Sequence, residues 1–152
     1  MRVIEIFCDG SGTTWDRSAG YGFVIILDGE FHSEGHGHIP QGTNNDAEMA
    51  AAIKGMIAAK DVWGGLITQG VVSVKLCSDS QLCLGWASGR YRHNNPERSK
   101  TVALLQELFR EMSVEPVWVK GHNGHVHNSR ADALAYKGRT GEFKLKRDRP
   151  KS

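Results

Sequence analysis

Four acidic residues are the side chains of this sequence best suited to do chemistry. Asp9 and Asp79 each follow an apolar segment with the character of a strand. Glu48 and Asp132 each stand near the start of a helical pattern. Four carboxylates that converge repel one another and raise each other's pKa unless cations lie between them. Mg²⁺ and Mn²⁺ prefer oxygen ligands, and paired metal ions suit displacement at phosphorus, so the pattern predicts metal-dependent cleavage of a phosphodiester.

Taken singly, each carboxylate also has an ordinary structural interpretation. Asp9-Gly10 and Ser78-Asp79-Ser80 are common turn sequences. Glu48 and Asp132 would stabilise a helix by lying near its positive end. The interpretation as a site therefore depends on convergence. If the strands that end at Asp9 and Asp79 are parallel neighbours, both carboxylates emerge at the sheet edge where α/β proteins bind ligands.

The elements that must position these residues follow from the hydrophobic pattern. Strands are expected at residues 3–8, 21–27, 31–39, 71–77 and 114–119. Helices are expected at 44–60, at 80–86, from Pro96 to about Met112, and after a cap at Asn128 or Ser129, with a loop at 63–70. Asp28-Gly29 predicts a hairpin. The predicted fold is α/β, a mixed five-stranded sheet with a three-strand antiparallel meander, parallel strands and helices on both faces.

Composition places the chain among soluble globular proteins. It has 152 residues, of which 39% are hydrophobic and 24% charged, which fits one domain with a substantial core. The three cysteines argue against a disulfide framework. The N-terminus has no signal-peptide pattern, and no apolar run reaches membrane-spanning length. We therefore expect a cytoplasmic protein with no membrane partner.

The charge is concentrated at the C-terminus. Residues 137–152 hold seven basic and two acidic residues, a net charge of +5 within a chain whose total is +2. We expect the chain after Gly138 to be loosely ordered. A basic tail on a mildly acidic body indicates a polyanionic partner, and the alternative is a solvated end with no partner.

Two further segments offer polar groups near the carboxylates. Gly121 and Gly124 flank His122 in a segment that would bring an imidazole near the acidic cluster, where it could move a proton or assist product release. The alternatives are a solvent-exposed loop histidine, or a zinc set formed with His125 and His127. The other segment, residues 43–45, could cap a helix, bind a nucleic-acid backbone, or do both.

Four sequence blocks, in order, resemble the type 1 ribonuclease H family. They are Asp9-Gly10-Ser11, Thr43-Asn44-Asn45-x-Ala47-Glu48, Asp79-Ser80-Gln81, and Trp118-Val119-Lys120-Gly121-His122-x-Gly124-His125 with Asn128, Arg130, Ala131 and Asp132. The resemblance covers about residues 1–138 and implies the ribonuclease H-like fold. It also implies an endonuclease that hydrolyses the RNA strand of RNA–DNA hybrids and leaves 5′-phosphate and 3′-hydroxyl ends. We expect the protein to be a monomer.

The resemblance assigns roles to individual residues. Two Mg²⁺ ions, which Mn²⁺ could replace, would be held by Asp9, Glu48, Asp79 and Asp132, with His122 as a mobile auxiliary group. Thr43 would contact a phosphate of the DNA strand. Ser11 and Ser80 would lie near the RNA backbone, and Asn44, Asn45 and Gln81 along the minor groove.

The sequence departs from the family pattern in two places. The segment 12–19 lacks the asparagine with which many members touch substrate, and the segment 86–100 is too short for the basic protrusion of some bacterial members. We therefore expect a form that lacks the protrusion, with a ribonuclease H domain at 1–138 and a basic tail at 139–152. Two rivals are a different nuclease or transposase of the same superfold, and a hybrid-binding module without catalysis.

Overall fold

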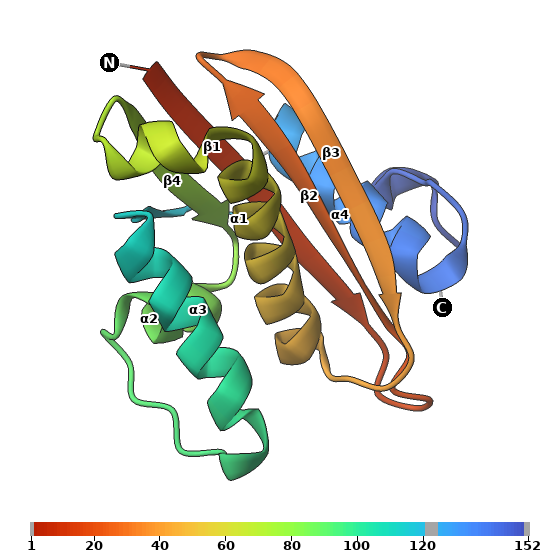
Figure 1. The fold of residues 1–152 in the computed structure, drawn as a ribbon. Helices are drawn as coiled ribbons and strands as arrows, with labels where there is room; N and C mark the ends of the chain where they lie inside the picture. Colours follow the sequence, from red (N-terminus) through yellow and green to blue (C-terminus); the bar gives the residue numbers. More distant parts are fainter. Residues whose placement is uncertain (1, 121–124, 151–152) are drawn as a thin grey trace.

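One five-stranded sheet, in the order β3-β2-β1-β4-β5, forms the centre of the computed structural model, which describes residues 2–120 and 125–150 (Figure 1). Its strands are β1 (Arg2–Gly12), β2 (Ala19–Leu27), β3 (Glu30–Ile39), β4 (Val72–Ser78) and β5 (Glu115–Trp118). β1, β2 and β3 pair antiparallel, while β4 is parallel to both β1 and β5. The predicted mixed sheet is confirmed.

The hairpin between β2 and β3 has the predicted chemistry. Asp28 and Gly29 have positive φ angles of 51° and 84°, which a tight two-residue hairpin requires at both central positions. The Asp28 carboxylate also accepts hydrogen bonds from the Arg2 side chain (2.8 Å) and the Val3 N–H (2.9 Å). The turn thereby ties the start of β1 to the end of β2.

Helices cover both faces of the sheet, as Figure 1 shows. They are α1 (Asn44–Thr68), α2 (Gln81–Ser88), α3 (Ser99–Glu111) and α4 (Val126–Thr140). Alternate side chains of β1 point to opposite faces. Ile4 and Ile6 pack in the core beneath α1 and α3, whereas Phe7 packs with Leu134 in the smaller core beneath α4. No described helix is both long enough and apolar enough to cross a membrane.

Three predicted helix boundaries are wrong. The helix expected from Pro96 begins with a 3₁₀ turn, η1 (Pro96–Arg98), and α3 starts at Ser99. α1 continues to Thr68 through the predicted loop, because Trp63 and Ile67, one turn apart, are buried in the core with 8% and 7% of their surface exposed. That burial outweighs the low helix propensity of Gly64 and Gly65. α4 begins at Val126, so the predicted caps Asn128 and Ser129 lie inside the helix.

The chain after α4 follows a defined path. Gly141 ends the helix in the left-handed conformation (φ 88°), and a short 3₁₀ helix, η2 (Lys146–Asp148), follows. The tail therefore differs from the expected loose end, because it returns to the body of the protein and contacts α4. The division into a domain at 1–138 and a tail at 139–152 stays a prediction.

Candidate active site

A glycine brings the first two carboxylates together. Gly10 follows Asp9 in β1, and a Cβ atom at Gly10 would lie 2.6 Å from the backbone nitrogen of Glu48. The missing side chain lets β1 approach the first turns of α1 closely. The Gly10 N–H donates to Asp9 Oδ1 (2.9 Å) and to Glu48 Oε1 (3.2 Å). One backbone amide thus orients both carboxylates.

The N-terminus of α1 is fixed by a capping box. The Thr43 hydroxyl accepts a hydrogen bond from the Asp46 N–H (3.2 Å), and the Asp46 carboxylate accepts one from the Thr43 N–H (2.8 Å). Arg98 forms an ion pair with Asp46 and holds the pKa of that carboxyl down at about 2. These contacts fix the start of α1 and thereby the position of Glu48, which follows Asp46 by two residues.

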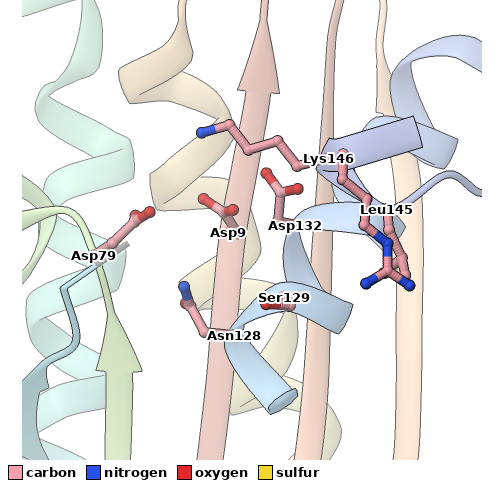
Figure 2. A pocket seen from close by; sticks show the side chains of 8 residues that line it. Asp9, Asp79, Asn128, Ser129, Asp132, Leu145 and Lys146 are labelled. Atoms are coloured by element: carbon pink, nitrogen blue, oxygen red, sulfur yellow. The ribbon is translucent and has the colours of Figure 1, made fainter. Parts of the chain in front are cut away.

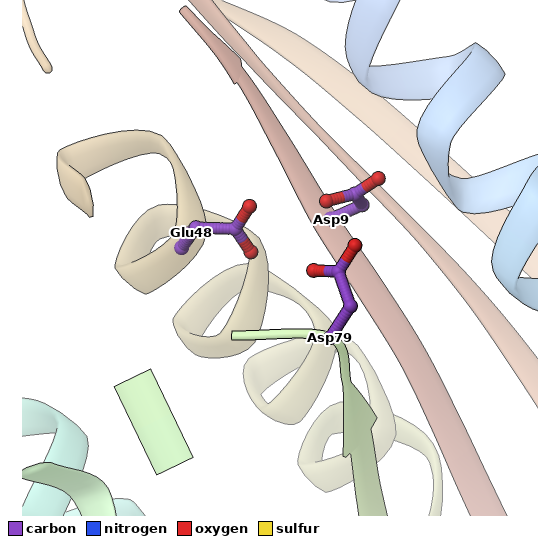
Figure 3. A group of neighbouring side chains, drawn as sticks. All are labelled: Asp9, Glu48 and Asp79. Atoms are coloured by element: carbon purple, nitrogen blue, oxygen red, sulfur yellow. The ribbon is translucent and has the colours of Figure 1, made fainter. Parts of the chain in front are cut away.

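Parallel pairing of β1 and β4 adds the third carboxylate. The register places Phe7 opposite Cys77, and Asp9 and Asp79 each follow two residues later. Figure 3 shows Asp79 facing the pair on β1 and α1. Carboxylate oxygens of Asp9, Glu48 and Asp79 lie within 4.8 Å of one another. The predicted convergence at the carboxyl ends of parallel strands is present in the structure.

The electrostatics of this group favour a bound cation. Burial, followed by the neighbouring carboxylates, raises the pKa of Asp9 well above its usual range. Burial, the largest cause, also raises the pKa of Glu48 to about 8 and the pKa of Asp79 above its ordinary value. Glu48 Oε2 is buried and has no hydrogen-bond partner among the described residues. Hard oxygen donors with an unpartnered buried atom fit a divalent cation such as Mg²⁺.

The fourth carboxylate, Asp132, lines the same pocket as Asp9 and Asp79. Figure 2 shows Asp132 on α4, facing the space above Asp9 and Asp79. The pocket measures about 300 Å³ and is lined by Asp9, Asp79, Asn128, Ser129, Asp132, Leu145, Lys146 and Arg147. Asp132 is not part of the tight oxygen group, and its Oδ2 accepts a hydrogen bond from Arg149. The tail therefore forms one wall of the pocket, which the sequence did not predict.

The predicted substrate-contact residues lie around this edge of the sheet. Asn44 and Asn45 are exposed at the start of α1, and Gln81 is exposed at the start of α2. Thr43 is engaged in its capping box but also lines a cleft. Ser80 caps α2 by accepting from the Cys83 N–H (3.1 Å). Their roles toward substrate stay predictions.

The two serines and the histidines have different surroundings. Ser11, like Ser80, already has a protein partner, because its hydroxyl accepts a hydrogen bond from Arg139 Nε (2.9 Å). His122 lies outside the described residues. His125 and His127 pack against the ring of Phe7, with ring centroids 4.8 and 5.2 Å away. Within the described ranges, the one group with metal-ligand spacing is the set of three carboxylates.

Comparison with known proteins identifies, over nearly the whole chain, the family that the four sequence blocks resemble. The family model for RNase H matches residues 1–140. The chain is 34% identical over 149 residues to a ribonuclease H of Nitrosomonas eutropha, covering 91% of this chain and 90% of the relative. It is 32% identical to a ribonuclease H of Dechloromonas aromatica, covering 90% and 93%. The chain belongs to the ribonuclease H family. It is accordingly an enzyme of the nuclease class.

Solved ribonuclease H structures have the same fold. RNase H1 from the halophilic archaeon Halobacterium salinarum superposes with a TM-score of 0.71 at 28% identity, covering 90% of this chain and 96% of that chain. LC11-RNase H1, solved in complex with an RNA/DNA hybrid, gives a TM-score of 0.77 at 24% identity, with coverage of 90% and 96%. The carboxylate cluster described above is therefore set in the ribonuclease H fold.

Proposed function

We propose that this protein is an endonuclease that hydrolyses the RNA strand of RNA–DNA hybrids. The observation that carries the proposal is the convergence of Asp9, Glu48 and Asp79 within 4.8 Å, beside a pocket that Asp132 lines, in a chain of the ribonuclease H family. Buried carboxylates that face one another and have raised pKa values are typical of functional sites.

The same four carboxylates would hold two divalent ions, Mg²⁺ or in its place Mn²⁺. When bound, such ions activate water and stabilise charge on the oxygens of a phosphodiester during in-line displacement. The protein would contribute the fixed positions of Asp9 and Glu48, which share the Gly10 N–H, and of Asp79 at the end of β4. The products would carry 5′-phosphate and 3′-hydroxyl ends.

Recognition of the hybrid would use the polar groups around the sheet edge. The exposed Asn44, Asn45 and Gln81 could hydrogen-bond in the minor groove, where the 2′-hydroxyls distinguish RNA from DNA. Thr43 would contact a phosphate of the DNA strand, and Ser11 and Ser80 the RNA backbone. The hybrid bound to LC11-RNase H1 supports this class of substrate. A monomeric state and a cytoplasmic location also remain predictions.

Cleavage of one labelled sequence in three forms tests the proposal. The RNA–DNA hybrid should be cut in its RNA strand in the presence of Mg²⁺, while duplex DNA and duplex RNA should stay intact. Cleavage of duplex DNA would favour another nuclease of the same superfold. Binding of the hybrid with no cleavage in either Mg²⁺ or Mn²⁺ would favour a non-catalytic binding module.

His122→Ala should slow turnover by about 10²-fold without abolishing it, because general acid–base assistance contributes less than the carboxylate site itself. Steady-state kinetics on the hybrid measure the effect. An unchanged rate would assign His122 to the solvent-exposed loop. Complete loss together with weaker metal binding would make it a metal ligand instead.

Removing the tail after Gly141 should weaken binding of the hybrid and make it less sensitive to salt. The deleted residues 142–152 hold five basic and two acidic residues, a net charge of +3. Each phosphate that such a charge neutralises releases counterions, so log affinity changes more steeply with log salt. Affinity for an uncleaved hybrid, measured with Asp9→Asn in Ca²⁺, gives this slope. Equal slopes with and without the tail would show a solvated end with no role in binding.

A further inference from the structure

The C-terminal tail is anchored on Asp132 by one arginine. The Arg149 guanidinium forms an ion pair with Asp132 Oδ2, and its Nη2 also donates to the backbone carbonyl of Asp132 (3.3 Å). The side chains of Arg149 and Asp132 are only 17% and 24% exposed. The pair is therefore less screened by solvent than a surface salt bridge, which contributes little.

The surroundings of Arg149 fix the guanidinium in place. Its Nε and Nη2 donate to the backbone carbonyl of Lys144 at 3.3 and 3.2 Å. Its central carbon lies 4.3 Å from the centroid of the Tyr136 ring, one turn after Asp132 on α4. The planar group is thus sandwiched between the helix and its own tail, and Arg149 can hold a carboxylate in one orientation.

Asp132 is held by a side chain from the tail, whereas Asp9 and Glu48 are held by a backbone amide. Asp9 and Glu48 accept hydrogen bonds from the Gly10 N–H. Asp132 lies in the interior of α4, where backbone N–H groups bond within the helix. Within the described part of the chain, Arg149 is the one hydrogen-bond partner of its carboxylate, and this partner uses Oδ2.

We propose that Arg149 is a positioning residue of the carboxylate site. By holding Oδ2 of Asp132, it leaves Oδ1 as the oxygen offered to the pocket, and it thereby strengthens the binding of a divalent ion. The inference rests on the proposed function, which makes Asp132 a metal ligand. It assigns the tail a role at the site that is separate from any contact with the hybrid.

Arg149 could also weaken the binding of a divalent ion. The direction in which Mg²⁺ affinity changes when Arg149 is replaced therefore tests the proposal. A guanidinium close to the site carries a positive charge that would repel an incoming cation. In this case, however, the charge is paired with Asp132. Removing a hydrogen-bonded partner of a metal ligand typically lowers metal affinity or activity 10–100-fold. We therefore expect positioning to outweigh repulsion.

Calorimetric titration of Mg²⁺ into the full-length, substrate-free protein decides the question. Arg149→Met should bind Mg²⁺ about 10-fold more weakly than the wild type. Lys144→Met is the matched control, because it removes one positive charge from the same tail, where Lys144 pairs with the exposed Glu142 at 3.2 Å. Its affinity for Mg²⁺ should stay that of the wild type.

A second variant keeps the test valid if Arg149→Met does not fold. Arg149→Lys keeps the charge but loses the planar fork, so it should also bind Mg²⁺ more weakly than the wild type. Equal or tighter Mg²⁺ binding by the folded Arg149 variants would overturn the proposal and make the tail a competitor of the metal. Hybrid cleavage by the wild type, assayed on the same preparation, separates the role of Arg149 from the proposed function. If the wild type did not cleave the hybrid, the proposed function would be contradicted, whatever the Mg²⁺ affinities of the variants.

Discussion

Asp9→Asn should abolish cleavage of the hybrid, with a loss of at least about 10³-fold, while the fold stays intact. Metal-assisted stabilisation of a transition state is worth several kcal/mol, and each 1.36 kcal/mol is tenfold in rate. Asparagine retains the oxygen that accepts the Gly10 N–H at 2.9 Å, so the local geometry can persist. Single-turnover kinetics on the labelled hybrid would measure the loss.

The melting temperature in EDTA separates a catalytic role of Asp9 from a structural one. Neutralising Asp9 removes charge from a crowded, buried group, so the metal-free variant should melt no lower than the wild type. Asp61→Asn removes the same charge from an exposed position of α1 and serves as the control for net charge. A variant at Asp9 that cleaves near the wild-type rate would refute the assignment. Markedly lower melting would indicate a structural role.

The positions of three carboxylates of the site follow from local sequence patterns. Apolar segments that end at Asp9 and Asp79 define two strands. The antiparallel meander and the helix that lie between them in the sequence make these two strands parallel. Their carboxylates must then emerge at one edge. Glu48 is placed by its distance from the capping residue Thr43, which is also a local signal. The sheet and the three-carboxylate cluster could accordingly be predicted from the sequence.

The features that the sequence did not predict depend on contacts between distant residues. Arg98 reaches Asp46 across 52 positions, and Arg149 reaches Asp132 from a tail whose composition predicts a loosely ordered segment with a polyanionic partner. The last turns of α1 are likewise decided by tertiary burial, because the propensity of Gly64 and Gly65 opposes a helix there. Periodicity contains no information about such partners, since each local segment is compatible with several of them.

In the absence of metal, the protein should lose stability as the pH rises from about 4.5 to about 8. In the unfolded chain Glu48 ionises at its ordinary pKa of 4.5, whereas in the folded protein its pKa is raised to about 8, and that of Asp9 is raised too. Between these pH values the folded state keeps a proton that the unfolded chain has released. Raising the pH therefore favours unfolding. At about 1.4 kcal/mol per pKa unit, the shift of Glu48 from 4.5 to about 8 alone corresponds to a loss on the order of 5 kcal/mol.

Urea unfolding in EDTA at several pH values between 5 and 8 measures this loss, and Glu48→Gln isolates its cause. Glutamine does not titrate, so the variant should show a flatter dependence and exceed the wild type in stability at pH 8. The pKa of Asp46 is lowered to about 2, so Asp46 makes the folded protein less stable as the pH falls. This effect occurs in acid, below the pH range of the experiment. Mg²⁺ should restore wild-type stability at pH 8, because a cation between the carboxylates favours their ionised forms. An identical pH dependence in wild type and variant would show that Glu48 ionises normally in the folded protein. The carboxylates would then lack the mutual repulsion that favours a bound cation.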